Sequence, residues 1–153
     1  MRNRIATIAI AAIASLGLVI STTACDPAPT ASKVTNTVDI ACAAGTYATP
    51  TDWYLPATAS PKGLVWLQHG FTESKDDWAE YGKKLSDAGF IAMATTLPTA
   101  DIFGCTVENV GNNTGYLNNI ATMFGGMGTS SRAIERSWAD AQKKAGRTTT
   151  ALL

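Results

Sequence analysis

Eight residues, Leu64-Val65-Trp66-Leu67-Gln68-His69-Gly70-Phe71, decide the fold of this 153-residue chain. The first four are apolar at consecutive positions, which is typical of a strand buried on both faces of a parallel sheet. Residues 90–95 form a second apolar run of the same kind. The two runs therefore predict two buried strands of one sheet.

A helix is predicted between these strands. Ser74 and Asp77 approximate a capping box, and Gly89 is placed to end the helix. Its expected inward face carries residues at helical spacing, namely Trp78, Tyr81, Leu85 and Ala88. Strand, helix and strand within about 33 residues predict a right-handed βαβ unit.

Further elements are predicted on both sides of this unit. Residues 38–42 and 52–55 indicate two antiparallel strands, joined through Gly45-Thr46 and the region of Pro50. Two helices are expected later, over 116–124 and 131–145, with stops at Gly125-Gly126 and at Gly146. Their expected inward residues are Leu117, Ile120, Ala121 and Phe124 in the first, and Ile134, Trp138 and Ala141 in the second.

The N-terminal residues have the pattern of an export signal. Arg2 and Arg4 precede an apolar run of about 16 residues, slightly shorter than the roughly 20 that span a bilayer. We expect a signal peptide over 1–24 and a flexible tether over 25–37, rich in Pro, Ala, Thr and Ser. The end of the signal resembles that of a bacterial lipoprotein, which implies a lipid on Cys25 and an anchored location at the cell membrane. Thr22 departs from that pattern, and ordinary cleavage after Ala24 with secretion is the alternative.

The remaining cysteines fit an exported protein. If Cys25 carries lipid, Cys42 and Cys105 form an even pair in an oxidising compartment, and we expect a disulfide between them. Two separate buried thiols are the alternative.

Composition excludes several classes of function. Apolar residues make up 46% of the chain and charged residues 16%, as in a globular protein. Without Arg2 and Arg4, ten basic residues face twelve acidic ones, so no nucleic-acid partner is expected. The one histidine, His69, excludes a two-histidine metal site within the chain, and we expect neither a metal nor a cofactor.

The His69-Gly70-Phe71 segment, between an apolar strand and a capped helix, resembles the α/β-hydrolase family. The resemblance implies an α/β fold with three layers, in which residues 38–153 form the incomplete N-terminal half of a hydrolase sheet, an antiparallel hairpin followed by a parallel βαβ unit. In that family the backbone N–H after the His-Gly pair, here that of Phe71, helps to form the oxyanion hole. A plain turn at Gly70, with His69 as a polar strand cap, is the alternative interpretation.

The catalytic residues of that family are not identifiable. The family's base follows the nucleophile in the chain, so His69 is not that base, and no Gly-x-Ser-x-Gly nucleophile elbow occurs. Residues 125–131 are glycine-rich but do not match. We therefore expect an inactive fragment whose complete form hydrolyses ester or similar acyl bonds. In the family the strand that ends at His69 pairs with the nucleophile strand, so its edge is expected to be open here. The alternative function is a cell-surface lipoprotein that serves binding or structure without catalysis.

Overall fold

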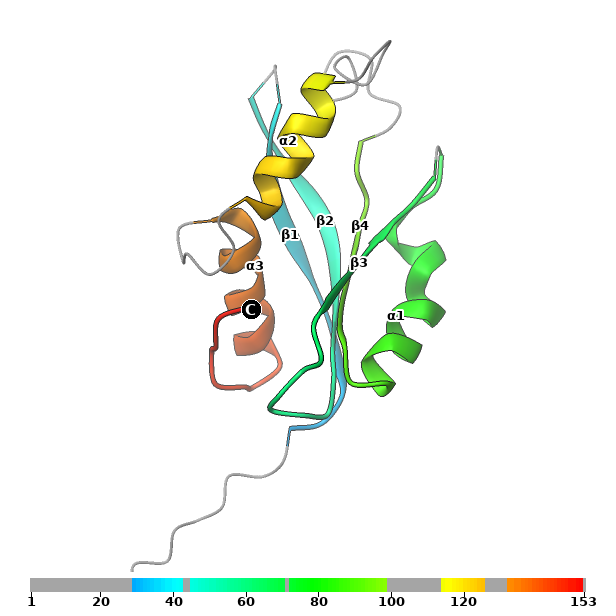
Figure 1. Cartoon of the computed structure of the whole chain (residues 1–153), viewed down its shortest axis with the longest axis vertical. Coiled ribbons are helices and arrows are strands. Elements are labelled where there is room, and N and C mark those ends of the chain that lie inside the picture. The colour runs from blue at the N-terminus through cyan, green and yellow to red at the C-terminus, as the bar shows by residue number, and fades with distance from the viewer. Residues whose placement is uncertain (1–28, 43–44, 71, 99–113, 126–131, 153) are drawn as a thin grey trace, which may run out of the picture.

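The computed structural model describes residues 29–42, 45–70, 72–98, 114–125 and 132–152. Within them, four strands form one open mixed sheet in the order β1-β2-β4-β3, and helices pack against it (Figure 1). The predicted α/β class is therefore confirmed at this level.

The N-terminal hairpin is longer than predicted. β1 (Ser32–Cys42) and β2 (Gly45–Leu55) pair in antiparallel register along their whole length. Residues 32–37, expected in the tether, thus belong to a strand, because Val34 and Val38 point into the core while the residues next to them are more exposed. Gly45-Thr46 and Pro50 lie within β2 and not in the connection, and Pro50 is tolerated because β2 pairs with β4 only from Thr51 onward.

The predicted βαβ unit is confirmed. β3 (Leu64–Gln68) and β4 (Ile91–Thr95) are parallel, and between them lie the short 3₁₀ helix η1 (Lys75–Trp78) and α1 (Ala79–Asp87). The capping box of Ser74 and Asp77 is present at the start of η1. All of β4 is buried, but β3 is only half-buried, because it is the last strand in the sheet order. The prediction that β3 is buried on both faces was wrong for this reason.

Helix α1 covers one face of the sheet (Figure 1). Tyr54, Ala92 and Ala94 form a buried cluster there, and Leu67, Trp78 and Leu85 pack against it. Two residues of the predicted inward face were wrong: Tyr81 is 58% exposed, and Ala88 is exposed as well. The buried residues of α1 are the small Gly82 and Ser86, because the ring of Tyr54 occupies the space against Gly82.

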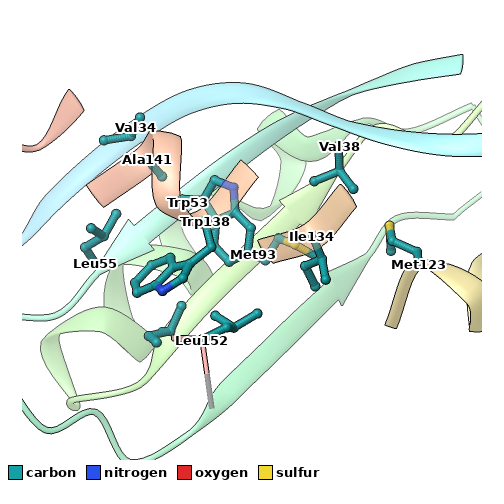
Figure 2. Close-up of a cluster of buried hydrophobic side chains, with 11 residues drawn as sticks. Val34, Val38, Trp53, Leu55, Met93, Met123, Ile134, Trp138, Ala141 and Leu152 are labelled. Carbon is teal, nitrogen blue, oxygen red and sulfur yellow. The ribbon is translucent and has the colours of Figure 1, made fainter. Parts of the chain in front are cut away.

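The opposite face is covered by α2 (Thr114–Phe124) and α3 (Ala133–Lys144) (Figure 1). Figure 2 shows the main core between α3 and the sheet, where the rings of Trp53 and Trp138 lie 5.3 Å apart. The predicted inward residues Ile134, Trp138 and Ala141 are all buried. In α2, the predicted inward residues Ile120 and Phe124 are confirmed, since Ile120 is buried and Phe124 packs against the core. Leu117 and Ala121 were wrong because both are exposed, and Met123 is buried in their place.

The residues after α3 fold back onto it. The side-chain amide of Gln142 donates to the carbonyl of Thr150 at 2.9 Å and accepts the Thr150 N–H at 2.9 Å. Leu152 is buried in the main core, as Figure 2 shows. The guanidinium of Arg147 donates to the carbonyls of Pro56 and Thr30. These contacts tie the segment after α3 to the base of the N-terminal hairpin.

Candidate functional site

His69 lies at the tip of β3 and is buried, with 4% of its surface exposed. Its Nε2 accepts the backbone N–H of Leu97 at 2.8 Å, and its Nδ1 lies 2.6 Å from the carbonyl oxygen of Gly70. A neutral ring with its proton on Nδ1 satisfies both contacts, because Nε2 then has a free lone pair for Leu97. His69 therefore joins the segments that follow β3 and β4, and neither ring nitrogen is free to take a proton from a substrate.

The turn after His69 is closed by a carboxylate. The N–H of Gly70 donates to Oε2 of Glu73 at 2.8 Å, and the N–H of Glu73 donates to the carbonyl of Gly70 at 3.3 Å. Thr72 has a φ of 68°, in the left-handed region that non-glycine residues seldom adopt. Phe71, the predicted oxyanion donor, lies outside the described residues.

The start of η1 is attached to the end of β4. The backbone N–H of Lys75 donates to Oγ1 of Thr96 at 3.0 Å, while Ser74 and Asp77 cap the first turn. Since β3 and β4 are parallel, their carboxyl ends lie at the same edge of the sheet, where ligands of open α/β sheets bind. Gly70, Glu73 and Lys75 are thus held at the edge where such a site would form.

A buried charged cluster beside this turn was missed by the sequence analysis. The carboxylate of Asp52, on β2, is fully buried and accepts a hydrogen bond from Oγ1 of Thr35 at 2.6 Å. It pairs with Nζ of Lys33 at 2.7 Å and with Nζ of Lys75 at 3.2 Å. Burial by itself would raise the pKa of Asp52, but the hydrogen bonds from Lys33, Thr35 and Lys75 outweigh burial and lower it below 3.8. The cluster thus holds the carboxylate of Asp52 in a fixed position between two cations. The sequence did contain one indication of it, because a charged residue, Asp52, lies inside a predicted strand.

A polar network lies on the other face, between β1 and α3. Oγ of Ser137 accepts the indole N–H of Trp53 at 2.9 Å and donates to Oδ1 of Asn36 at 2.8 Å. Nδ2 of Asn36 donates to Oδ2 of Asp140 at 3.0 Å. Asn36, Ser137 and Asp140 line an open cavity of about 380 Å³. Ser137 is 5% exposed and its hydroxyl already makes both bonds, so the network positions the helix and supplies no nucleophile.

The predicted cysteine chemistry falls largely outside the described residues. Cys25 and Cys105 are not among them, and of Cys42 only the backbone, at the end of β1, is described. The disulfide and the lipid on Cys25 therefore stay predictions. In the described part of the chain, no group of three or more His, Cys, Asp or Glu side chains could hold a metal ion. No helix in that part is long and apolar enough to cross a membrane.

Comparison of the sequence with models of protein families and with curated proteins finds no match.

Proposed function

We propose that this chain is the N-terminal half of an exported hydrolase of the α/β-hydrolase type, whose complete form cleaves ester or similar acyl bonds. The observation that carries the proposal is the position of the His69-Gly70 turn. The turn follows β3, the last strand of the sheet in the described part of the chain, and leads into a capped helix and a parallel strand. An antiparallel hairpin precedes it, as in the family that the sequence resembles.

The open edge of β3 supports the same proposal. In the family, the strand that carries the nucleophile pairs at this edge, and the nucleophile follows at the carboxyl end of that strand. A further strand added parallel to β3 would end beside the Gly70 turn. With α1 on one face and α2 and α3 on the other, the completed sheet would have three layers.

The chemistry would be divided between the two halves. A serine of the absent half would attack the acyl carbon, and a histidine with a carboxylate would accept its proton and pass it to the leaving alcohol. The N–H of Phe71 would donate to the oxyanion that forms on the carbonyl oxygen. This chain would supply the donor and the scaffold and would itself be inactive, because its one histidine is held between Gly70 and Leu97.

The location follows from the N-terminal pattern. Residues 1–24 would be removed on export and Cys25 would carry a lipid, so that a short linker before β1 would attach the domain to the membrane. A secreted form, cleaved after Ala24 without lipid, would leave the chemistry unchanged.

The test starts with the coding sequence beyond Leu153. About 40 codons in each of the three frames suffice to hold a strand and a Gly-x-Ser-x-Gly elbow, which the proposal expects in one of them. The present chain should not react with a fluorophosphonate serine probe, whereas the extended chain should. Three random continuations would contradict the proposal.

Two substitutions at Phe71 test the oxyanion donor in the extended chain. Phe71→Pro removes the N–H and should lower kcat about 100-fold to 1,000-fold towards a nitrophenyl ester. Phe71→Ala keeps the N–H and is the matched control, expected to retain most of kcat. Equal losses of kcat in both variants would show that the Phe71 N–H does not bind the oxyanion.

One observation favours the alternative function, a surface module without catalysis. The carboxylate of Glu73 already accepts the N–H of Gly70, which places a negative charge at the turn where an oxyanion would form. In such a module the turn would be a closed structural element. Glu73→Gln in the extended chain discriminates between the two functions. Removal of this negative charge should raise kcat if the turn binds an oxyanion, and should have no such effect if the turn is only structural.

A further inference from the structure

We propose that a cavity at the base of the N-terminal hairpin binds a small monocarboxylate with an apolar body. The cavity has a volume of about 380 Å³ and lies between residues 56–63, which join β2 to β3, and the segment after α3. Both segments lie at the lower end of the sheet in Figure 1. The volume falls at the small end of the range of ligand pockets, which is about 300 to 1,000 Å³.

This cavity is separate from the turn at His69. β3 runs from Leu64, which follows the first lining segment, to Gln68, which precedes His69. The cavity and the turn thus lie at opposite ends of the same strand. The proposal therefore does not rest on the proposed function.

Arg147 gives the cavity a positive charge. It is the one charged residue among the described residues that line the cavity. Its guanidinium donates to the backbone carbonyls of Thr30, Leu55 and Pro56, all of which are uncharged. No carboxylate in the described part of the chain pairs with it, and burial lowers the pKa of Arg147 with no neighbouring anion to raise it. A ligand carboxylate would supply the missing negative charge.

The guanidinium of Arg147 is held in place before any ligand arrives. Its three bonds to carbonyls fix it against the base of the hairpin, and the backbone N–H of Arg147 donates to the carbonyl of Gln142 at 2.9 Å. Three of the five guanidinium N–H groups are used in this way, which leaves two for a ligand. A cation that is already ordered loses little side-chain entropy on binding.

The walls of the cavity favour an apolar ligand body. Pro29, Ala59 and Pro61 line it beside Trp138 of α3. The indole N–H of Trp138 already donates to the carbonyl of Thr150 at 3.0 Å, so it is not available to a ligand. A ligand with many polar groups would leave most of them without partners here, at a cost in affinity.

One cation also limits the charge of the ligand. A carboxylate carries one negative charge and is matched by Arg147 alone. A phosphate monoester carries nearly two at neutral pH and would leave part of its charge uncompensated. The combination of one fixed guanidinium and apolar walls thus points to a short aromatic or aliphatic acid.

Fluorine NMR of the full chain tests this site. The probe is fluorophenylpropanoate, and fluorophenylpropanamide, which has the same shape without the charge, is the matched control ligand. A mild non-ionic detergent keeps the apolar N-terminal residues dispersed, and detergent alone gives the blank. We expect a dissociation constant of about 1 mM or lower for the acid, and binding of the amide at least about tenfold weaker. An acid signal identical to that of the blank, or equal affinities for acid and amide, would overturn the proposal.

Two substitutions at Arg147 test the cation. Arg147→Gln removes the charge, whereas Arg147→Lys keeps it on a different head group. The affinity for the acid should fall at least about tenfold in Arg147→Gln and by less in Arg147→Lys, with circular dichroism showing that both variants are folded. Equal losses in the two variants would show that the charge does not bind the acid, and the proposal would fail.

A second pair of variants leaves Arg147 and its bonds in place. Ala59 lines the cavity and Ala57 does not, although both residues are exposed. Ala59→Trp should fill the cavity and weaken binding of the acid at least about tenfold, whereas Ala57→Trp should change it less than about twofold. Undiminished binding by Ala59→Trp would place the acid elsewhere and refute this site. None of these results affects the proposed function, which the serine probe on the extended chain tests separately.

Discussion

The Nε2 atom of His69 accepts the backbone N–H of Leu97 at 2.8 Å and so joins the ends of two parallel strands, β3 and β4. The structure thus gives this histidine a structural task, because its ring holds the end of β3 and the segment after β4 together.

Replacement of His69 by Ala should destabilise the fold. The buried N–H of Leu97 would lose its acceptor, at a cost of about 1 to 3 kcal/mol in the free energy of unfolding. Urea unfolding followed by tryptophan fluorescence measures this loss. Thr148→Ala, at an exposed position away from His69, is the control and should change stability by less than about 0.5 kcal/mol. Equal stability of the two variants would mean that the bond to Leu97 is not important.

The free energy of unfolding should depend on pH through the carboxylate of Asp52. Its carboxylate is buried between Lys33 and Lys75, and Asp52→Asn should cost about 2 to 4 kcal/mol at neutral pH. This is less than for a fully buried pair, because the Lys33 side chain is 44% exposed. Asp76→Asn, which removes the exposed partner of Lys75, should cost less than about 1 kcal/mol.

The sign of the pH dependence follows from the lowered pKa of Asp52 in the folded state. The carboxylate stabilises the fold above its unfolded pKa near 3.8, and that contribution is lost as the pH falls through the lower folded value. Denaturant midpoints measured from pH 6 downward should therefore converge for the parent chain and Asp52→Asn. A difference between the two midpoints that stays constant at all pH values would show that the ionised carboxylate of Asp52 does not stabilise the fold.

Gly82 on α1 should not tolerate a methyl group. A Cβ there would lie 2.7 Å from Cζ of Tyr54 and closer still to Cε2, so Gly82→Ala should destabilise the fold by about 1 to 3 kcal/mol despite the better helix propensity of Ala. Gly125→Ala is the matched control, since its nearest neighbour is the carbonyl of Ala121 at 3.4 Å. Thermal unfolding compares the two. The addition of Tyr54→Leu should reduce the effect of Gly82→Ala, and a lack of coupling would show that the ring is not the obstacle.

Gln142 should hold the segment after α3 in place. Gln142→Ala removes both bonds to the backbone of Thr150 and should cost about 1 to 3 kcal/mol. Limited proteolysis should then cut within residues 147–152 faster than in the parent chain. Lys143→Ala, on the exposed side of the same helix, should leave the cutting rate unchanged.

Local patterns predicted the βαβ unit well. The capping box of Ser74 and Asp77, the apolar runs and the helical spacing in α3 each depend on residues close in sequence. The exposed Tyr81 and Leu117 were misplaced because spacing shows that a helix has an apolar face but not which part of it meets the sheet. The long hairpin was underestimated because Asn36 interrupts the inward series of Val34, Val38 and Ile40 in β1, so three consecutive polar residues concealed the period of two.

The site was harder to predict because its contacts join distant residues. The motif at His69 was visible, but its bond to Leu97 depends on how β3 and β4 are paired. Likewise, Asp52 appears in the sequence as an isolated charge, and only the fold brings Lys33 and Lys75 to it.

The bonds between Asn36 and Ser137 span 101 residues of sequence, and they have a consequence for the order of folding. The apolar face of the first hairpin cannot be covered until α3 has been made. At ribosomal rates of about 5 to 20 residues per second, the side chains of Val34, Val38 and Trp53 would stay exposed to solvent for roughly 5 to 20 seconds during synthesis. The folding rate should therefore be limited by the slow search that brings the two ends of the chain together.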